Sequence, residues 1–375
     1  MNNMLKLNFY DDFFCTADNC TFTCCEGWEI QVDSDTFHKW THDQPKKDSI
    51  SEHVKMIKKS NQTEYVIAMD SHMCCPFLDQ EGLCNVVIEY GDKLLPVTCR
   101  TFPRQHNHFD DLAEYSLTCA CPAVIDIINK STSDLSFSYE GDNSIWSQVP
   151  LEYKLRETMI HIMKQPAFAV KDKLLLIFDL LLCVKHELHI TTEILDRYQH
   201  DVSLHSIIDI WDTYHTEKED AYSEMQELFL DIILNYREHT SFRYYLKDIS
   251  DLAEDLSIES GAIAWHEFSL VLKPYEKLLE NCIISKLFGN CISDDIEEMM
   301  LSFQVVVTEY IMITYSSFLN WLIAEKATLT YTDIRDFIVI YSRIIEYNKD
   351  GMIEFWEHSF DEPIWEFGFM HLLLY

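Results

Sequence analysis

The second part of the chain has the hydrophobic spacing of amphipathic helices. In Leu151–Gln165 the apolar residues recur on one side of a helix, and Pro166 ends the pattern. The same period returns in Phe168–His189, Ala221–Tyr236, Gly261–Leu272, Tyr275–Phe288, Asp295–Ala324 and Thr332–Tyr347. Thr332 with Asp333 predicts a helix start, and Gly351 follows the last segment. At the typical length of about 11–12 residues, the pattern predicts about six to eight helices.

The first part of the chain has a different pattern, with short strand-like pieces between loops. These pieces are Trp28–Val32 and Asn85–Tyr90, and Asn85–Pro96 reads as a hairpin around Gly91 and Asp92. We therefore expect a mainly α protein in which a small Cys-rich metal-binding region with short strands precedes an all-α domain. The expected boundaries are residues 1–128 for the Cys-rich region, a polar linker at 129–150, and the helical domain at 151–375.

The composition is that of a folded and strongly acidic protein. Hydrophobic residues make up 47% and aromatic residues 13% of the 375 positions, which excludes general disorder. The net charge is −34, with −9 in residues 1–125 and −25 in residues 126–375. Such a surface repels nucleic acid phosphates and anionic membranes, so we expect neither as a partner. It favours a cationic partner, and general solubility explains it equally well.

No segment of the sequence reads as a membrane span or a secretion signal. The apolar stretch from Leu174 is interrupted by Asp179, and Tyr310–Ala324 is shorter than the roughly 18 uncharged residues that a spanning helix needs. The N-terminal segment lacks a long apolar run and carries acids early. We therefore expect a cytoplasmic protein with reduced thiols. The sequence gives no indication of the oligomeric state.

Cysteines are concentrated in the first third of the chain. Ten of the thirteen are Cys15, Cys20, Cys24, Cys25, Cys74, Cys75, Cys84, Cys99, Cys119 and Cys121. Thiolates bind zinc or iron–sulfur clusters. The irregular spacing, without any Cys-x2-Cys pair, favours an iron–sulfur cluster over zinc. Buried thiols without metal remain a third interpretation, whereas the odd total and a reducing compartment disfavour a disulfide framework.

Several familiar motifs are absent. The cysteine triplet of radical chemistry on S-adenosylmethionine, Cys-x3-Cys-x2-Cys, fails after Cys20 and Cys24 because position 27 is glycine. No Gly-x-Gly exists in the chain, which excludes a Rossmann methyltransferase. Three histidines lie near the cysteines and are possible additional ligands: His72, His106 and His108.

A set of motifs in a fixed order resembles the flagellin lysine N-methylase family, within the Cys-rich zinc/iron-chelating proteins. The motifs are FxC-x4-C-x3-CC-x-GW at Phe13–Trp28, CPFLDQEGLCNVVIEYGD at Cys75–Asp92, TCRTFPR at Thr98–Arg104, SLTCACP at Ser116–Pro122, ENCIISKLFGN at Glu280–Asn290 and IYSR at Ile340–Arg343. The resemblance implies methyl transfer from S-adenosylmethionine to lysines of flagellin. It also implies a cysteine-bound metal cluster, a 4Fe-4S cluster in the first instance and zinc as the alternative.

The resemblance carries eight cysteines over as metal ligands. They are Cys15, Cys20, Cys24, Cys25, Cys75, Cys84, Cys99 and Cys121, with Cys74 and Cys119 as extras. Eight ligands make two four-ligand sites, or one cluster with spare structural thiols. Arg100 and Arg104, beside a ligand cysteine, are candidates to bind the carboxylate of the cofactor. Neutralising thiolates or nearby acids is the alternative role for both.

No residue of the sequence stands out as the catalytic base. Trp28 is a candidate to cover the cluster or stack on an adenine, and Tyr90 and Tyr115 are candidates to orient a lysine amine. Core packing is the alternative role of Trp28. Glu309 and Tyr310 are explained as ordinary positions of an amphipathic helix. His186 and His189 lack a third ligand nearby. A metal or iron–sulfur carrier and a redox protein are the alternative functions.

Overall fold

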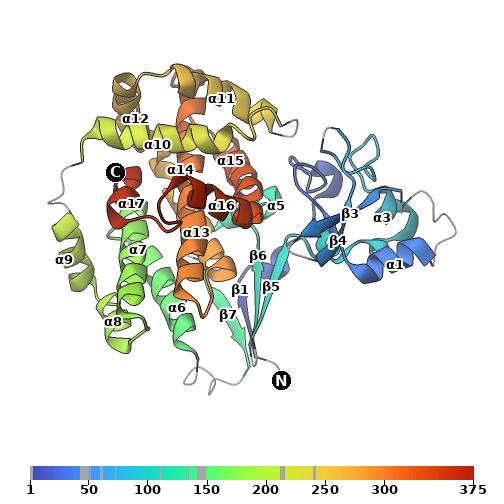
Figure 1. The fold of residues 1–375 in the computed structure, drawn as a ribbon, viewed down its shortest axis with the longest axis horizontal. Helices are drawn as coiled ribbons and strands as arrows, with labels where there is room; N and C mark the ends of the chain where they lie inside the picture. Colours follow the sequence, from blue (N-terminus) through green and yellow to red (C-terminus); the bar gives the residue numbers. More distant parts are fainter. Residues whose placement is uncertain are drawn as a thin grey trace.

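The computed structural model describes residues 3–42, 50, 52–59, 62–71, 73–109, 112–131, 133, 135–141, 149–211, 216–239 and 242–375. A large helical body and a smaller lobe lie on opposite sides of a narrow sheet (Figure 1). The helices of the body are α5 (Pro122–Lys130), α6 (Leu151–Met163), α7 (Val170–Glu187), α8 (Thr192–Arg197), α9 (Asp201–Trp211), α10 (Lys218–Ile233), α11 (Arg243–Asp255), α12 (Ile258–Leu272), α13 (Glu276–Asn290), α14 (Ile296–Ile323), α15 (Tyr331–Ile344), α16 (Lys349–Ser359) and α17 (Phe367–Leu374), with the 3-10 turns η5 (Lys273–Tyr275) and η6 (Glu346–Asn348). The protein is therefore mainly α with short strands, as the sequence predicts.

The four-stranded sheet joins the two parts of the molecule. It contains β1 (Asn3–Leu7), β5 (Arg104–Phe109), β6 (Leu112–Leu117) and β7 (Phe137–Glu140), in the order β5-β6-β1-β7. The pairing of β1 is parallel with β6 and antiparallel with β7, whereas β5 and β6 pair antiparallel. Strand β7 falls inside the segment 129–150 that the sequence marks as a linker. Helix α13 packs on the sheet, and a Cβ atom at Gly289 would lie 3.0 Å from Gln105 Oε1 and Ser116 Oγ.

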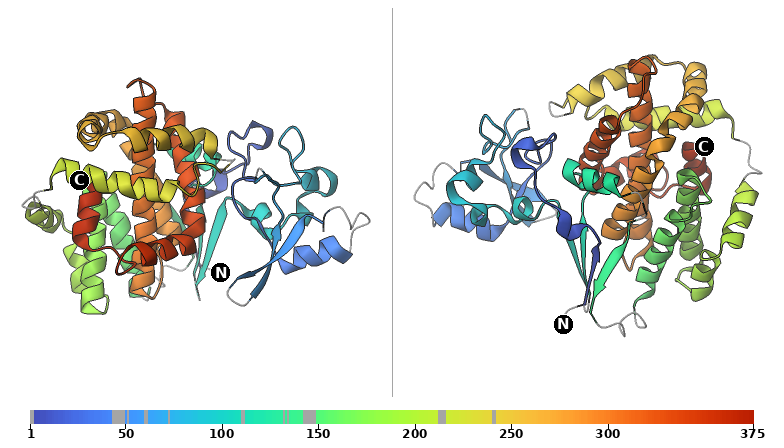
Figure 2. Two further views of the ribbon diagram at one scale, coloured as in Figure 1. Left: turned by 45° about the horizontal axis from the view of Figure 1, so that its top comes forward. Right: turned by 180° about the vertical axis from the view of Figure 1, so that it is seen from behind.

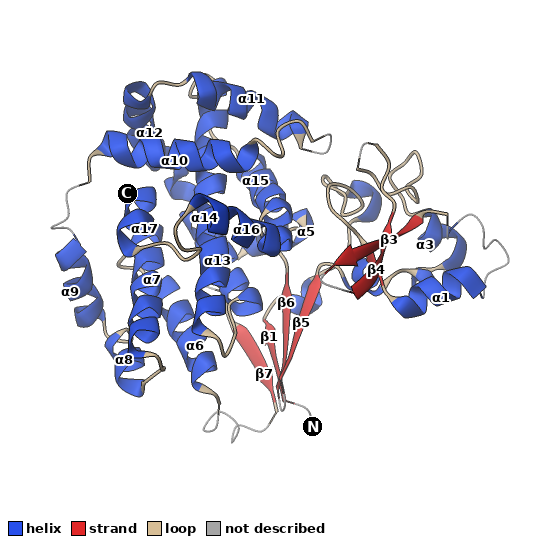
Figure 3. Ribbon diagram, viewed as in Figure 1, coloured by secondary structure: helices blue, strands red, loops and turns tan. Residues whose placement is uncertain are grey.

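The smaller lobe has its own core around a buried tryptophan. Its elements are β2 (Gln31–Val32), α1 (Ser34–His42), β3 (Val54–Lys59), β4 (Gln62–Ile67), α3 (Asn85–Tyr90), η3 (Asp92–Leu94) and α4 (Val97–Thr101), and the segment leading into it holds the 3-10 turns η1 (Tyr10–Asp12) and η2 (Ala17–Asn19). Trp40 is fully buried and donates its indole N–H to Leu94 O at 2.9 Å. Loops take up much of this lobe, as Figure 3 shows in tan. A lobe with so little regular structure has few backbone ladders to stabilise it.

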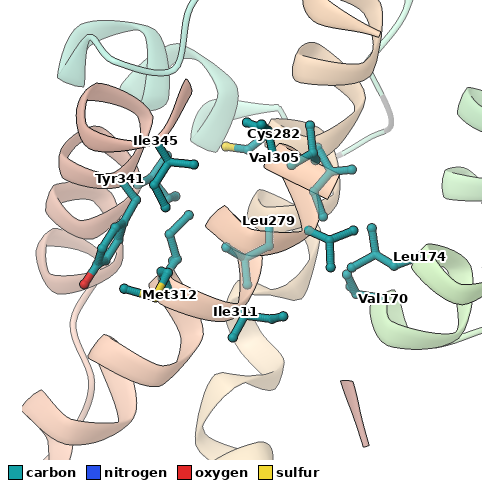
Figure 4. Close-up of a cluster of buried hydrophobic side chains, with 14 of the residues drawn as sticks. Val170, Leu174, Leu279, Cys282, Val305, Ile311, Met312, Tyr341 and Ile345 are labelled. Carbon is teal, nitrogen blue, oxygen red and sulfur yellow. The ribbon is translucent and has the colours of Figure 1, made fainter. Parts of the chain in front are cut away.

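The hydrophobic core of the helical body surrounds α14, which is buried along most of its length. Figure 2 shows this helix from two further sides, with the other helices around it. In Figure 4, Ile311 and Met312 of α14 meet side chains from other helices, among them Leu174, Leu279 and Tyr341. The same core includes residues from the Cys-rich region, such as Phe13, Phe22 and Cys121. Part of that region is thus built into the helical body.

The helical period of the sequence is confirmed, and several local predictions are wrong. Gly351, expected to follow the last helix, lies inside α16. Residues Asn85–Tyr90 form helix α3 instead of a strand, because Val86 alone of the β-branched run is buried. Gly91 then ends α3 with a φ of 75°, and a 3-10 turn follows where a hairpin was expected. In the other strand-like piece, Trp28–Val32, only β2 pairs, with β4.

The N-cap of α15 lies two residues before the predicted one. Thr330, and not Thr332, occupies the N-cap, and its hydroxyl accepts from Asp333 N at 3.3 Å. The Asp333 carboxylate accepts from Thr330 N at 2.8 Å in return, which completes a capping box. Among the described residues, no helix has the length and apolar character needed to cross a membrane.

Candidate metal centre

A cavity of about 470 Å³ lies in the smaller lobe, against the helical body. Seven of the eight cysteines predicted as ligands line it: Cys15, Cys20, Cys24, Cys25, Cys75, Cys84 and Cys99. The other walls are largely aromatic or aliphatic, with Trp28 and Phe102 from the lobe and Tyr347 from η6. Thiols in apolar surroundings are the environment in which proteins hold soft metals.

Main-chain pairing brings the cysteine loops together. Cys75 N donates to Cys25 O at 2.8 Å, and Gly27 N donates to Met73 O at 3.1 Å. Gly27 has a φ of 85°, a left-handed conformation that favours glycine, so the chain turns directly after the cysteine pair. An isolated bridge between Leu78 and Cys84 closes the next loop. Segments some 50 residues apart in sequence thereby face one cavity.

The thiols interact with one another across the cavity. Cys24 and Cys25 are hydrogen-bonded, and so are Cys25 and Cys75. Burial, with neighbouring Cys24 and Cys84, raises the pKa of Cys99 to about 12. Without metal, the Cys99 thiol holds its proton at neutral pH, so metal binding there would release a proton.

Cys121 does not line the cavity but belongs to the same group of thiols. It precedes α5 at the edge of the helical body, and burial raises its pKa to about 12, with a further contribution from Cys20 and Cys24. All eight predicted ligands therefore lie around one place in the fold.

The two extra cysteines have other partners. Cys74 Sγ donates to Glu26 Oε2 at 3.3 Å. Cys119 is hydrogen-bonded to Cys282 of α13, inside the helical body. Neither extra cysteine lines the cavity.

The described thiols are not arranged as the donor set of a single metal ion. In the part of the chain that the structure describes, no three Cys, His, Asp or Glu side chains converge on one ion position. A zinc site needs four donors at about 2.0–2.3 Å from one centre. An iron–sulfur cluster separates its cysteine ligands, so thiols spread around a cavity are compatible with it.

Arg343 of α15 is the residue of this region that sequence reasoning did not assign. Its Nη1 donates to Thr23 O at 2.7 Å and to Glu26 O at 3.4 Å. Its Nη2 donates to Phe22 O at 3.0 Å and to Ala120 O at 3.1 Å, and its Nε also donates to Ala120 O. One guanidinium thus holds the main chain on both sides of the cysteine loop. Arg343 ends the IYSR motif, but no spacing rule connects that motif to cysteines some 320 residues earlier.

The Arg343 guanidinium is also a buried cation that interacts with three of the thiols. It is 3% exposed, and burial lowers its pKa while Cys24, Cys121 and Cys20 act in the opposite direction. It lies 4.4 Å from the ring centroid of Phe22 and 5.1 Å from that of Trp28. A cation in this position would stabilise thiolates bound to a metal.

Trp28 forms part of the cavity wall. Its Nε1 donates to Cys24 O at 2.7 Å. Its ring packs edge-on against Phe102 and Tyr347, with centroids 5.1 Å and 4.7 Å away. These contacts fix the tryptophan between the lobe and the helical body.

Neither arginine predicted to bind the cofactor lines the cavity. Arg100 is exposed at the end of α4. Arg104 Nη2 donates to Phe13 O at 3.2 Å, and its guanidinium lies over the rings of Tyr10 and Phe13. Arg104 therefore positions the segment that leads to Cys15, and a cofactor role for either arginine stays a prediction.

The remaining sequence candidates lie outside the cavity. Tyr90 packs in the core of the lobe, and Tyr115 packs against Tyr10 and His106. His108 is exposed on β5, whereas His72 lies outside the described residues. On the helical body, His186 and His189 are exposed, Tyr310 lines a separate pocket, and Glu309 is buried.

Comparison with known proteins identifies the family. A family model described as the FliB lysine N-methylase C-terminal domain matches residues 156–373, more than half of the chain. The chain belongs to this family. The match to the FliB lysine N-methylase family contains Arg343, while the clustered cysteines precede it in sequence.

Relatives from Salmonella agree with this family. The lysine-N-methylases of Salmonella choleraesuis and Salmonella typhimurium are each 34% identical to the chain over 119 residues. That region is 31% of this chain and 30% of each relative, so the chain matches about a third of their length. The flagellar biosynthetic protein FliU of Salmonella muenchen is also 34% identical over 119 residues, 70% of its length. No solved structure matches the chain.

Proposed function

We propose that the protein is a lysine N-methyltransferase that transfers methyl groups from S-adenosylmethionine to lysines of flagellin and carries a cysteine-bound iron–sulfur cluster. The observation that carries the proposal is the family match over residues 156–373. The names of the Salmonella relatives, lysine-N-methylase and flagellar biosynthetic protein, support the reaction and the substrate.

The charge of the protein suits a lysine-bearing partner. A net charge of −34 attracts cationic segments and accelerates their encounter with the surface. S-adenosylmethionine enters as the second substrate, whose sulfonium carries the methyl group. The lysine side chain must lose a proton before its nitrogen attacks that methyl group.

The eight cysteines around the cavity are the proposed ligands of the cluster. The cluster, when bound, ties the loops of the smaller lobe to one another and to the start of α5. Its binding energy then adds to the folding energy of a lobe that has few strands of its own. Arg343 holds the cysteine loop against the helical body by the hydrogen bonds to its main chain.

The direct test is methyl transfer to flagellin. The protein is purified without oxygen and incubated with S-adenosylmethionine and the flagellin of the strain that encodes it. Mass spectrometry of flagellin peptides should show lysines with one or more added methyl groups. An iron-loaded, folded protein that leaves this flagellin unmodified would contradict the proposal.

A matched pair of variants tests the ligand assignment. Cys24→Ser removes a thiol that lines the cavity. Cys74→Ser removes a thiol outside the cavity, next in sequence to the cavity residue Cys75. We expect Cys24→Ser to lose iron and sulfide and to melt at a lower temperature, and Cys74→Ser to retain both. If the two variants keep equal iron, the cavity does not hold the cluster. Transfer of the cluster to an apo-ferredoxin without methylation would favour the carrier function.

A further inference from the structure

A second, polar cavity of about 220 Å³ lies on the helical side of Tyr347, which also borders the cysteine cavity. Four elements contribute its polar walls: β5, α13, α14, and the stretch from η6 into α16. The cavity is lined by Gln105, Asn290, Ser302, Val305, Val306, Glu346, Tyr347 and Lys349. Asn290 ends the ENCIISKLFGN motif, to which the proposed function assigns no role.

A buried ionic network adjoins this cavity. Lys286 Nζ lies 2.6 Å from Glu309 Oε2 and 2.6 Å from Glu346 Oε2, and it donates to Ser342 Oγ at 2.8 Å. The side chains of Lys286 and Glu309 are 5% and 1% exposed. Glu309 Oε1 is buried and has no hydrogen-bond partner among the described residues. A carboxylate oxygen left without a partner in a protein interior is costly unless it serves a purpose.

Glu346 connects the network to the cavity. One of its oxygens faces Lys286. The other, Oε1, accepts only long hydrogen bonds, from Thr118 Oγ1 at 3.3 Å and from Gln105 Nε2 at 3.5 Å. A carboxylate oxygen has lone pairs that can accept shorter hydrogen bonds than these two. Oε1 can therefore accept a proton from a group inside the cavity.

The ammonium groups of Lys286 and Lys349 disfavour a further ammonium ion in the cavity. Lys349 Nζ is held by Ser302 Oγ at 2.8 Å, and Lys286 lies behind Glu346. Like charges lower the pKa of an amine that enters between them, and this favours the neutral nucleophile. The site therefore combines a proton acceptor with the electrostatics that a lysine needs before methyl transfer.

We propose that the polar cavity binds the side-chain amine of the acceptor lysine and that Glu346 takes its proton. This inference rests on the proposed function. The lysine N–H bond breaks and its proton passes to the Glu346 carboxylate. The nitrogen lone pair then forms the N–CH3 bond, while the S–CH3 bond breaks and its electrons return to the sulfur of the donor.

The charged groups facing Glu346 come from three helices. They are Lys286 of α13, Glu309 of α14 and Lys349 of α16. The Cys291 thiol and the Tyr347 hydroxyl also lie near Glu346, and the Cys119 thiol lies near Lys286. Thr118 and Gln105 are the neutral donors. Burial raises the pKa of Glu309 to about 7, against the attraction of Lys286.

The test is the pH dependence of methyl transfer in Glu346→Gln. We expect its turnover at neutral pH to fall by about 10²–10⁴-fold, the usual contribution of a general base. Its rate should recover as the pH rises toward about 10.4, where a lysine amine loses its own proton. The matched control is Glu354→Gln, an exposed carboxylate on α16, which should keep the wild-type rate and profile.

A second variant keeps the test valid if Glu346→Gln does not fold. Lys349 is partly exposed, and its replacement by methionine removes one like charge from the cavity. The pH–rate profile of Lys349→Met should shift to higher pH, by about 0.5–1 unit for one neighbouring charge. A folded Glu346→Gln with the wild-type profile, or an equal loss of rate at every pH, would overturn the assignment of Glu346. An unshifted Lys349→Met profile would do the same.

A binding measurement separates this inference from the proposed function. Calorimetry with N-acetyl-lysine methylamide should show binding to the wild type and at least tenfold weaker binding to Glu346→Gln. A wild-type protein that binds this probe through Glu346 but methylates no flagellin would refute the methylase proposal and support the lysine site. Methylation of flagellin by a Glu346→Gln protein with unchanged rate and probe affinity would refute the lysine site alone.

Discussion

Arg343 Nη1 on α15 lies 2.7 Å from the carbonyl oxygen of Thr23, the residue before Cys24. Through this bond, the helical body holds the main chain of the cysteine loop. The interaction connects the family-matched part of the chain to the proposed cluster ligands. The stability of the cavity should accordingly depend on a residue far from it in sequence.

Replacing Arg343 with methionine should therefore destabilise the protein strongly. The change leaves buried carbonyl groups without their donor, and each buried acceptor without a partner typically costs about 1–3 kcal/mol. Urea denaturation should show this loss, whereas Arg243→Met, at an exposed position on α11, should change stability by less than about 0.5 kcal/mol. Equal stabilities of the two variants would contradict the role of Arg343.

A second prediction concerns the buried ion pair between Arg156 of α6 and Glu114 of β6. The Arg156 guanidinium binds both Glu114 oxygens and donates to Phe288 O at 2.9 Å. Arg156→Met alone should cost about 3–5 kcal/mol because it leaves Glu114 buried and unpaired. Adding Glu114→Gln should recover part of that loss, as measured by urea denaturation. A double variant less stable than the single one would argue against this pairing.

Substitution by alanine should have opposite effects on stability at two of the glycines. A Cβ atom on Gly261 of α12 would lie 2.2 Å from the buried ring of Tyr222, so Gly261→Ala should cost about 1–3 kcal/mol through overpacking. Gly368 of α17 has open space around its Cβ position, and Gly368→Ala should stabilise the helix by about 0.5–1 kcal/mol. Thermal melting of both variants tests the packing of α10 against α12. A Gly261→Ala protein that melts above the wild type would contradict it.

The fourth prediction is a pH dependence of stability from Glu309. Its pKa is raised to about 7 in the folded protein, first of all by burial, whereas an unfolded glutamate titrates near about 4.3. Between these values the folded state binds more protons than the unfolded state. Stability should therefore fall as the pH rises from about 5 to about 7, by at most about 1.4 kcal/mol per pH unit.

Glu309→Gln should remove this part of the pH dependence. Urea denaturation from pH 5 to pH 8 should give the variant a shallower decline than the wild type. Glu297→Gln, at an exposed position of the same helix, should keep the wild-type slope. Parallel curves for wild type and Glu309→Gln would show that Glu309 does not titrate in this range.

Local patterns predicted most of the helical body but not all of it. The segments around α6, α7, α10 and α12–α15 have a clear 3.6-residue period, and each forms a helix. Helices α5, α8, α9, α11, α16 and α17 were not predicted, and the shortest of them, α8 and α17, have only six and eight residues in which a period can show. Asn85–Tyr90 shows the opposite error, since its β-branched residues have strand propensity and the tertiary fold makes it helical.

The sequence by itself located the clustered cysteines in the first third of the chain and predicted that most of residues 151–375 is helical. Both are local properties, carried by motif order and hydrophobic spacing. The tertiary structure alone decided that Arg343 and Tyr347 border the cysteine loops, and that Lys286, Glu309 and Glu346 form one buried network. Contacts between residues far apart in sequence depend on how helices and sheet pack, and a periodicity within one segment contains no record of that packing.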